Sequence, residues 1–297
     1  MVSVKSMAEH FALGIDIGGS HITCAPVTLG TQEIAVASLK RAYVDSKGSV
    51  SDIIEAWSNV ILDCNAAMQD SPVRIGIAMP GPFDYEQGIS YIRHQDKYDS
   101  LYGLNIKQLL ADRIGISNER IYFSNDAACY LQGEMVAGAG KGYRHVLGLT
   151  LGTGFGSAIA HPGELRDACY WCAGFRGRQA EDYFSTRWFV WRFEELTGRK
   201  PANVKAMVDS VEDWEVVQQV FVEFGRNLAG FLAPLIREEG FELVVIGGNI
   251  SNAFGLFRVE LERQLRAHGL GTIICQSQLN ENASLLGAAN LEAVSRG

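Results

Sequence analysis

The chain has 297 residues, enough for one large or two medium domains, and 47% of them are hydrophobic, so a sizeable core is possible. This composition excludes an intrinsically disordered chain, because such chains are poor in apolar residues. The net charge of −8 argues against a nucleic-acid partner or an anionic membrane surface and favours a small-molecule ligand.

The sequence carries no signal for membrane insertion or secretion. No run of about 18 uncharged apolar residues occurs, so no membrane-spanning helix is expected. The N-terminus lacks the apolar stretch and the small-residue cleavage site of a signal peptide. We therefore expect a cytoplasmic protein whose six cysteines are reduced and mostly lie in the core.

The chain alternates strand and helix patterns from its beginning. Residues 11–27 predict a β-hairpin, because apolar runs flank a polar, glycine-rich tip. Residues 49–69 predict a helix, because apolar residues recur every three or four positions after a capping box formed by Ser49 and Asp52. Further strands are expected at 33–39, 73–78, 120–123, 242–247 and 271–275, and further helices at 105–114, directly after 125–126, and at 180–197, 203–208, 213–237, 255–268 and 283–295.

Residues 145–160 repeat the opening pattern of strand, glycine-rich turn and strand. Strands that alternate with helices indicate an α/β architecture. Two units that each begin with such a hairpin predict two similar domains around a central cleft. We place the first domain at residues 1–124, with the C-terminal helix 284–297 packing back on it, and the second at residues 125–283.

Three glycine-rich turns are candidate phosphate sites: Asp16–Ser20, Gly152–Gly156 and Gly247–Asn249. Glycine lets backbone N–H groups approach phosphate oxygens, and such turns form anion-binding nests. The alternative is that they are only tight turns. A P-loop and a helix-opening G-x-G-x-x-G are both absent, so a dinucleotide-dependent dehydrogenase is not expected. Without a P-loop lysine, Mg²⁺ and the N–H groups of the turns must supply the positive potential for phosphate.

Two acidic residues stand where chemistry at these turns would need them. Asp16 lies beside the first turn, where a carboxylate can hold Mg²⁺ through waters; a plain turn aspartate is the alternative. Asp126 follows a strand and Asn125, where a general base would take the proton of a hydroxyl that attacks a phosphate. The alternative for Asn125 and Asp126 is that they only cap the next helix.

Six segments carry a resemblance to a known family: LGIDIGGSHI (13–22), IAMPGPFD (77–84), SNDAACYLQGE (124–134), LTLGTGFGSAI (149–159), LVVIGGNI (243–250) and ASLLGAANL (283–291). The sequence resembles the ROK family, the sugar kinases and sugar-dependent repressors of the hexokinase/actin-like ATPase superfamily. The segments follow the order and the approximate spacing of the family, so the resemblance spans nearly the whole chain. It implies the two-lobed, ribonuclease H-like fold of that superfamily.

The resemblance also implies roles for the matching residues. Asp126 would be the general base, and Asp16 would lie near Mg²⁺. ATP would be bound by Asp16, Gly18, Gly19 and Ser20, by Gly152, Thr153, Gly154 and Gly156, and, beside the adenosine, by Gly247, Gly248 and Asn249. The sugar would contact Gly81, Pro82, His94, Asp99, Asn125 and Glu181. For His94 and Asp99 the alternative is a solvated loop, and for Glu181 it is a helix-capping or surface glutamate.

The repressors of the family carry an added N-terminal helix-turn-helix. Only about ten residues precede the first predicted strand, which is too few for that motif. Together with the negative charge, this favours the kinase branch.

The chain departs from the family pattern after the second hairpin. Typical members continue with Gly-Glu-x-Gly-His, whose Glu and His bind sugar hydroxyls, and with a cysteine-rich zinc site. Residues 161–188 lack the motif, and Cys169 and Cys172 have no second pair, so we expect no zinc and interpret them as buried thiols near the hinge. Arg176 and Arg178 stand in this region, where they could bind a negatively charged or unusual sugar substituent or pair with carboxylates.

The segment 182–197 is apolar over most of its helical circumference, so we expect it to be buried on several sides. One interpretation places it in the core. The other, which the resemblance supports, places it at a homodimer contact.

Together these features predict an ATP- and Mg²⁺-dependent, glucokinase-like sugar kinase that phosphorylates a hexose or hexose derivative at its 6-hydroxyl. A sugar-sensing pseudokinase of the same fold is the alternative, because the standard sugar-contacting motif is missing. A kinase for acylamino sugars or polyols is a third. The sequence leaves open which sugar is used and whether the donor is ATP or polyphosphate.

Overall fold

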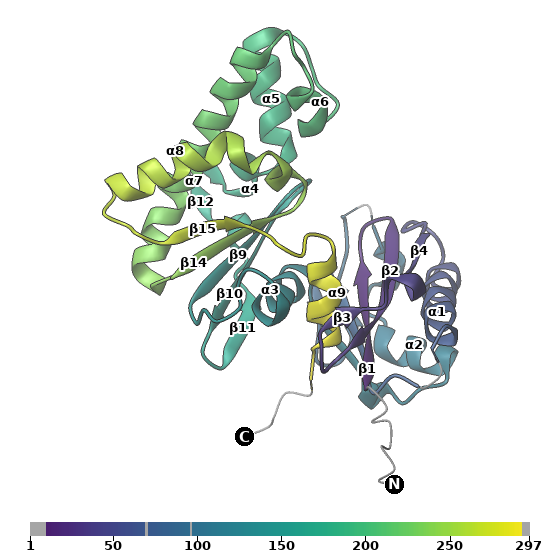
Figure 1. Cartoon of the computed structure of the whole chain (residues 1–297). Helices are drawn as coiled ribbons and strands as arrows, with labels where there is room; N and C mark the ends of the chain where they lie inside the picture. Colours follow the sequence, from purple (N-terminus) through teal and green to yellow (C-terminus); the bar gives the residue numbers. More distant parts are fainter. Residues whose placement is uncertain (1–9, 69–70, 96, 293–297) are drawn as a thin grey trace. The chain divides into compact units, whose positions relative to one another are not determined.

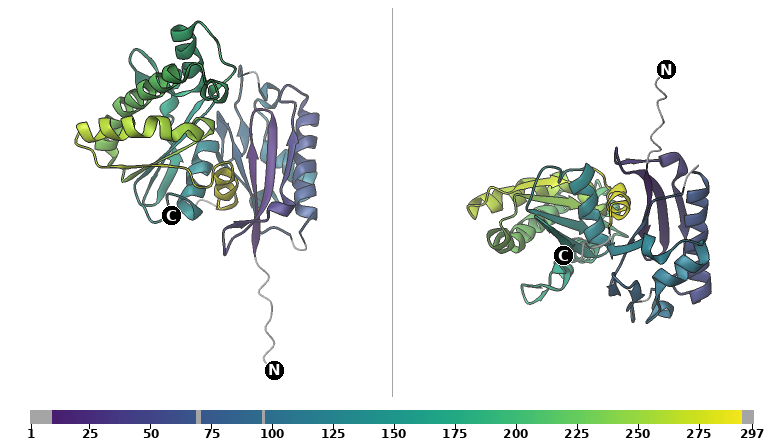
Figure 2. Two further views of the ribbon diagram at one scale, coloured as in Figure 1. Left: turned by 45° about the horizontal axis from the view of Figure 1, so that its top comes forward. Right: turned by 90° about the horizontal axis from the view of Figure 1, so that it is seen from below.

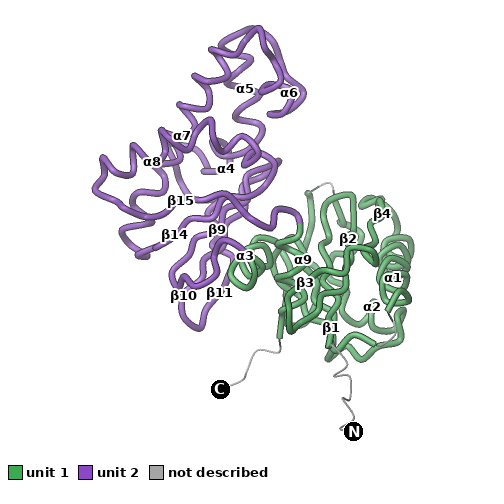
Figure 3. The backbone as a smooth tube through the Cα atoms, in the orientation of Figure 1, with its two compact units in different colours: residues 1–137, 282–297 green, residues 138–281 purple. Residues whose placement is uncertain are grey.

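The structure is a computed structural model that describes residues 10–68, 71–95 and 97–292. The chain divides into two compact units, residues 1–137 with 282–297 (unit 1) and residues 138–281 (unit 2) (Figure 3). We expected the second domain to begin at residue 125, but helix α3 (Asp126–Ala137) belongs to unit 1 because it packs against α9 (Asn282–Ala289). Within the described residues, no helix is both long and apolar enough to cross a membrane.

Unit 1 is built on a sheet with the strand order β3-β2-β1-β5-β8, and β4 also pairs with β2. β1 (Phe11–Ile17) and β2 (His21–Thr28) form the predicted hairpin, whereas β5 (Ile75–Met79) and β8 (Ile121–Asn125) continue the sheet in parallel with β1. Asp16 is opposite Ala78 and Met79 is opposite Asn125, so the carboxyl ends of these three strands meet at one edge. The shorter strands of this unit are β3 (Glu33–Ile34), β4 (Lys40–Tyr43), β6 (Phe83–Asp84) and β7 (Ile89–Ser90).

Helices cover both faces of this sheet (Figures 1 and 2). α1 (Val50–Ala66) and α2 (Ile106–Ile114) lie on one face, and α9 lies on the other. The predicted capping box is confirmed, because the Ser49 hydroxyl accepts from the backbone N–H of Asp52 while the Asp52 carboxylate accepts from that of Ser49. The apolar stripe of α1 faces the core, with Trp57 fully buried.

Glycines allow α9 to lie directly on the sheet. A Cβ atom at Gly14 or Gly76 would collide with the carbonyl oxygens of Leu285 and Ala288, which belong to α9. Such backbone-to-backbone contact ties the C-terminal segment to unit 1. The predicted helix 284–297 is shorter than expected, since α9 ends at Ala289, and residues 293–297 lie outside the described residues.

Unit 2 repeats the arrangement with the strand order β11-β10-β9-β14-β15. β9 (Val146–Leu151) and β10 (Phe155–His161) form the second predicted hairpin, and β14 (Leu243–Gly247) lies parallel to β9. Gly247 is opposite Thr150, so the carboxyl ends of β9 and β14 also meet at one edge. The other strands are β11 (Glu164–Asp167), β12 (Gly174–Phe175), β13 (Arg178–Gln179) and β15 (Ile273–Gln276).

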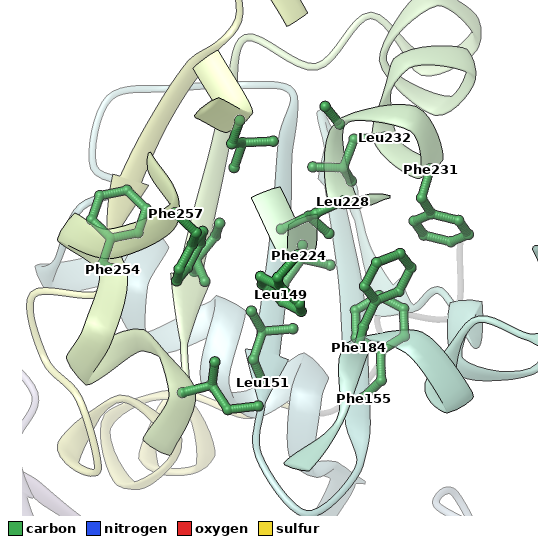
Figure 4. Close-up of a cluster of buried hydrophobic side chains, with 14 of the residues drawn as sticks. Leu149, Leu151, Phe155, Phe184, Phe224, Leu228, Phe231, Leu232, Phe254 and Phe257 are labelled. Carbon is green, nitrogen blue, oxygen red and sulfur yellow. The ribbon is translucent and has the colours of Figure 1, made fainter. Parts of the chain in front are cut away.

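The helices of unit 2 enclose a core rich in phenylalanine (Figure 4). They are α4 (Glu181–Phe184), α5 (Thr186–Thr197), α6 (Val204–Val208), α7 (Trp214–Glu239) and α8 (Phe254–Ala267). Phe184, Phe224 and Phe257 are fully buried, with the Phe224 ring 5.1 Å from that of Phe257 and 6.0 Å from that of Phe184. In both units, 3₁₀ turns occupy Val36–Ser38, Asp99–Leu101, Asn118–Arg120, Tyr170–Cys172 and Asn249–Ala253.

Two features of unit 2 differ from the expectation for residues 180–197. The single helix expected at 180–197 is interrupted at Ser185, whose extended backbone separates α4 from α5. α5 is also less buried than expected, because Trp188 and Phe189 face the core whereas 53% of the Trp191 surface is exposed. Leu196 is exposed as well, so in the single chain α5 has one buried face and two exposed apolar positions. Their burial at a homodimer contact stays a prediction.

Of the six cysteines, three are buried, two are exposed and Cys275 is half-buried. Cys24, Cys64 and Cys129 are buried, as predicted for small core residues. Cys169 and Cys172 are exposed, so their interpretation as buried thiols was wrong. They lie on the connection between β11 and β12.

Candidate active site

The first glycine-rich turn closes the β1–β2 hairpin at the carboxyl edge of the unit 1 sheet. The N–H of Gly18 donates to the carbonyl oxygen of His21 at 2.9 Å, and Gly18, Gly19 and Ser20 are all exposed. Asp16, which directly precedes this edge, is half-buried. The turn therefore presents backbone to solvent beside a carboxylate, which suits an anion with a bound cation.

The segment that contains His94 and Asp99 folds onto this turn. The hydroxyl of Tyr98 donates to the carbonyl oxygen of Gly18 at 2.7 Å, although 80 positions separate them in the sequence. One carboxylate oxygen of Asp99 accepts from the N–H of His94 at 3.1 Å, which closes the segment on itself. Both His94 and Asp99 are exposed, so the predicted sugar residues belong to a folded loop that is attached to the first glycine-rich turn.

A second group of predicted residues meets at the hydroxyl of Tyr85. This hydroxyl donates to the carbonyl oxygen of Met79 at 3.1 Å and lies 3.4 Å from the Nδ2 atom of Asn125, a donor. It also lies 3.2 Å from the position that a Cβ atom of Gly81 would take, so a side chain there would crowd it. Gly81 is half-buried and Pro82 is exposed, which leaves the backbone of this turn accessible beside Asn125.

Asn125 caps α3, and Asp126 is the first residue of that helix. The Oδ1 atom of Asn125 accepts from the N–H groups of Ala127 and Ala128 at 2.9 and 3.2 Å. Asn125 therefore caps the helix, but this capping uses only the side-chain oxygen and leaves the amide nitrogen directed toward Tyr85. Contact of Asn125 with a sugar stays a prediction. Asp126 is exposed, and one of its oxygens accepts from the N–H of Ala127 at 2.9 Å.

Both carboxylates of the predicted site raise the pKa of the same buried thiol, that of Cys129. Burial raises the pKa of Cys129 well above its usual value, and the negative charges of Asp16 and then Asp126 raise it further. The Ser124 side chain hydrogen-bonds to the thiol and opposes this shift. The strand register supplies the geometry, because Asp16 near the end of β1 and Asn125 at the end of β8, which Asp126 follows, belong to strands that both pair in parallel with β5.

This arrangement fits a magnesium ion. Mg²⁺ in phosphate-binding sites keeps several waters and takes one or two protein carboxylates together with phosphate oxygens. Asp16 offers such a carboxylate beside an open backbone turn. The described residues contain no group of three or more His, Cys, Asp or Glu side chains arranged to hold a metal ion by themselves.

The second glycine-rich turn, in unit 2, is held by α4 and α5. The carbonyl oxygen of Gly152 accepts from both the N–H and the hydroxyl of Thr186, at 2.8 and 2.9 Å. A carboxylate oxygen of Glu181 accepts from the N–H of Phe155 at 3.1 Å, and its other oxygen pairs with Arg187 at 2.7 Å. Glycine at position 154 makes this contact possible, because its Cβ atom would lie 2.9 Å from the Glu181 carboxylate.

Glu181 was predicted to bind sugar, and within unit 2 the structure places it against this turn. Both its oxygens are engaged there, and 28% of its side chain remains exposed. Its role as a sugar ligand stays a prediction.

The third glycine-rich turn lies next to the second. Gly248 has a φ of +80°, which favours glycine, and a Cβ atom there would lie 2.7 Å from the backbone nitrogen of Leu151. Leu151 directly precedes the second turn, so Gly247, Gly248 and Asn249 adjoin it in unit 2. Gly248 and Asn249 are exposed, as a ligand-binding turn requires.

The segment that replaces the usual sugar-contacting motif forms the small β12–β13 hairpin. The Arg176 guanidinium lies 5.3 Å from the ring centre of Phe175, and Arg176 and Arg178 are exposed. Within the described residues neither arginine forms an ion pair, so the predicted pairing with carboxylates is not found there. The thiol of Cys172 donates to the carbonyl oxygen of Cys169 at 3.2 Å.

Sequence reasoning missed three side chains at these turns: Tyr85, Tyr98 and Arg187. Tyr85 follows the Pro-Gly-Pro turn closely enough to have been considered. Tyr98 reaches Gly18 across a long stretch of sequence, and no local pattern predicts that contact. Arg187 could have been found only after the break between α4 and α5 was known.

A sequence model of the ROK family matches residues 12–177, more than half of the chain. The chain belongs to the ROK family. Among characterised relatives, a glucokinase of Thermotoga maritima is 26% identical and aligns over 94% of this chain and 96% of the relative. An N-acetyl-D-glucosamine kinase of Mannheimia succiniciproducens is 29% identical over 94% of this chain and 98% of the relative.

The fold of this ROK family member matches that of solved structures. The crystal structure of a ROK family glucokinase from Streptomyces griseus, in complex with glucose and AMPPNP, matches with a TM-score of 0.73. It is 21% identical, and the match covers 94% of this chain and 98% of that one. The likeness confirms the predicted α/β fold class, that of the actin-like ATPases.

Proposed function

We propose that the chain is an ATP-dependent sugar kinase that transfers the γ-phosphate to the 6-hydroxyl of a hexose or hexose derivative. The observation that carries this proposal is that Asp16, the first glycine-rich turn and Asp126 all lie at the carboxyl ends of neighbouring strands of the unit 1 sheet. Phosphoryl transfer needs positioned phosphates, a cation and a base, and little covalent chemistry from the protein. The named activities of the relatives, glucokinase and N-acetyl-D-glucosamine kinase, support it.

In this mechanism the Asn125 amide and the backbone at Gly81 orient the sugar. Asp126 accepts the proton of the sugar hydroxyl as its oxygen attacks the γ-phosphorus, since Asp126 is exposed beside Asn125. The N-terminus of α3 favours a negative charge at this position. Asp16 would hold Mg²⁺, which when bound offsets the negative charge of the phosphates.

The backbone N–H groups of the glycine-rich turns would bind the phosphates in this proposal. Ser20 and Thr153 add a hydroxyl to the first and second turns, and Asn249 and the backbone of Gly248 would lie beside the adenosine. The proposed ligand contacts of the three turns include six exposed residues, which supports contact with a ligand: Gly18, Gly19, Ser20, Thr153, Gly248 and Asn249. Gly152, Gly154 and Gly156 are half-buried, and Gly247 is buried.

A sugar-binding protein without turnover is the second candidate. It is favoured by the engagement of both Glu181 oxygens within unit 2 and by the absence of the family's sugar-contacting motif from residues 161–188. It would retain affinity for sugar without transferring phosphate.

ADP release from Mg·ATP, measured against a panel of hexoses, amino sugars and acylamino sugars, tests the proposal. We expect sugar-dependent ADP release with at least one member of the panel, and the phosphorylated product identifies the sugar and the hydroxyl. Repeating the assay with polyphosphate determines the donor. Saturable sugar binding without ADP release across the panel would instead support the second candidate.

A further inference from the structure

The segment that covers the first phosphate turn is anchored at three points. The N–H of Tyr98 donates to the carbonyl oxygen of Ser46 at 2.7 Å, and the Ser100 hydroxyl donates to that of Gly48 at 3.0 Å. The Tyr98 hydroxyl reaches the carbonyl oxygen of Gly18, and its ring is fully buried with its centre 5.2 Å from that of Trp57. The backbone of this segment is therefore fixed relative to the turn.

Lys97 directly precedes this anchor and extends over the turn. Its Cδ atom lies 3.9 Å from the position that a Cβ atom of Gly19 would take, so the aliphatic stem lies beside the exposed Gly19 backbone. Lys97 is half-buried, and among the described residues no carboxylate forms an ion pair with it. Its ammonium nitrogen is two bonds beyond Cδ on a flexible stem, so rotation of the last two bonds can direct it toward a ligand at Gly19.

A cation at this position would supply positive charge that the rest of the proposed phosphate site lacks. The chain has a net charge of −8 and no P-loop lysine, and Asp16 adds a further negative charge beside the turn. A phosphate group there would meet two carboxylates, Asp16 and Asp126, and a lysine ammonium would offset part of that repulsion.

We propose that Lys97, presented by Tyr98, binds the phosphates of the nucleotide at the first turn. This inference rests on the proposed kinase function. It adds a charged side chain to a phosphate site that would otherwise consist of backbone N–H groups and Mg²⁺. Lysine acts on phosphate as a mobile point charge, so arginine at this position should retain most of the effect.

The test measures ligand binding to the full chain by calorimetry for Lys97→Met, Lys97→Arg and the matched control Lys141→Met, an exposed lysine in unit 2. The ligands are Mg·ATP, inorganic tripolyphosphate and adenosine. For Lys97→Met we expect ATP and tripolyphosphate to bind on the order of ten- to hundredfold more weakly, as for loss of a charged hydrogen bond. Adenosine binding should be unchanged, and Lys97→Arg and Lys141→Met should resemble wild type.

Equal affinity of Lys97→Met and wild type for ATP and tripolyphosphate would overturn the proposal. So would a rise in the KM for sugar with an unchanged affinity for ATP, since Lys97 would then serve the sugar. A parallel loss of adenosine affinity, or a lowered Tm, would assign the effect to altered folding and would also count against it. If wild type binds ATP but phosphorylates no sugar, the kinase proposal fails while the binding data still decide the role of Lys97.

Discussion

The two hairpin turns connect strands that are paired in the same way, but different side chains surround them. Each closes an antiparallel hairpin whose first strand also pairs with a parallel neighbour. The first turn lies with Asp16 and Asp126 at one sheet edge, and Tyr98 holds it through a carbonyl oxygen. The second is held through Gly152 and Phe155 by α4 and α5, with the Glu181–Arg187 ion pair beside it.

In the proposed function the glycine-rich turns bind phosphate through their backbone. The side chains around each turn determine whether it can also bind a cation or take part in proton transfer. Carboxylates at the first turn can bind a cation and accept a proton. At the second turn the carboxylate is already paired with a guanidinium, which suits a purely structural or binding role. We therefore expect substitutions at the first turn to lower kcat and those at the second to raise the KM for ATP.

The largest effect that tests this comparison is expected from Asp16→Asn. Loss of the carboxylate removes the proposed Mg²⁺ contact at the transferring phosphate, so kcat should fall on the order of 10²–10³-fold, as when one preorganised electrostatic group is lost. Steady-state kinetics at several Mg²⁺ concentrations measures this. Asp63→Asn, an exposed aspartate on α1, is the control and should be unaffected. A normal kcat for Asp16→Asn would remove the distinction between the turns.

A smaller effect, and a different one, is expected from Glu181→Gln. The amide retains an oxygen for the Phe155 N–H but loses the charge that pairs with Arg187, so the turn should loosen. We expect the KM for ATP to rise by roughly three- to tenfold, equivalent to about 1 kcal/mol, with little change in kcat. Glu194→Gln on α5 is the matched control. A rise in the KM for sugar alone would show that Glu181 is a sugar ligand, as the family resemblance implies.

The smallest effect is expected from Tyr98→Phe, which removes the hydroxyl that holds the first turn. Gly18 is exposed, so water can replace the hydroxyl, and the unfolding free energy should fall by only about 1 kcal/mol near neutral pH. Chemical denaturation measures this, with Tyr102→Phe, an exposed tyrosine of the same loop, as the control. A loss several times larger would mean that the whole loop depends on this one contact.

Tyr98→Phe should also change how the unfolding free energy depends on pH. Burial raises the pKa of Tyr98 to about 12, against the opposing effect of the Trp57 indole. In the unfolded chain a tyrosine pKa is about 10, so the stabilisation linked to the neutral phenol is complete below that pH. It is lost as the pH rises from about 10 to 12, and Tyr98→Phe should lack this part of the pH dependence. The prediction would be contradicted if the unfolding free energies of wild type and Tyr98→Phe changed in parallel between about pH 10 and 12.

The regular elements of the fold were predictable because their signals are local. The hairpins at 11–28 and 146–161 show strand patterns on both sides of glycine-rich turns, and α1 has a periodic apolar stripe with its capping box. The two-residue strands β6, β7, β12 and β13 are too short to carry a pattern. The break at Ser185 was missed because apolar residues continue on both sides of it.

The candidate site was predictable in its backbone turns and less so in its side-chain partners. Glycine and aspartate at the ends of predicted strands can be located from the sequence, because the strand pattern and the turn that follows it are both local signals. The contacts of Tyr98 with Gly18 and of Glu181 with Phe155 join segments that are separate in the sequence, and tertiary packing alone brings them together. The domain boundary was misplaced for the same reason, because the packing of α3 on α9 decides it.

In the proposed function, phosphoryl transfer depends on Asp126, which takes the proton of the sugar hydroxyl. The most direct test is Asp126→Asn, with kcat measured on the sugar identified by the panel and ATP affinity measured by calorimetry. For Asp126→Asn we expect kcat to fall on the order of 10²–10⁴-fold, the usual contribution of a general base, with nearly unchanged ATP affinity. An Asp126→Asn enzyme that keeps a wild-type kcat would contradict it.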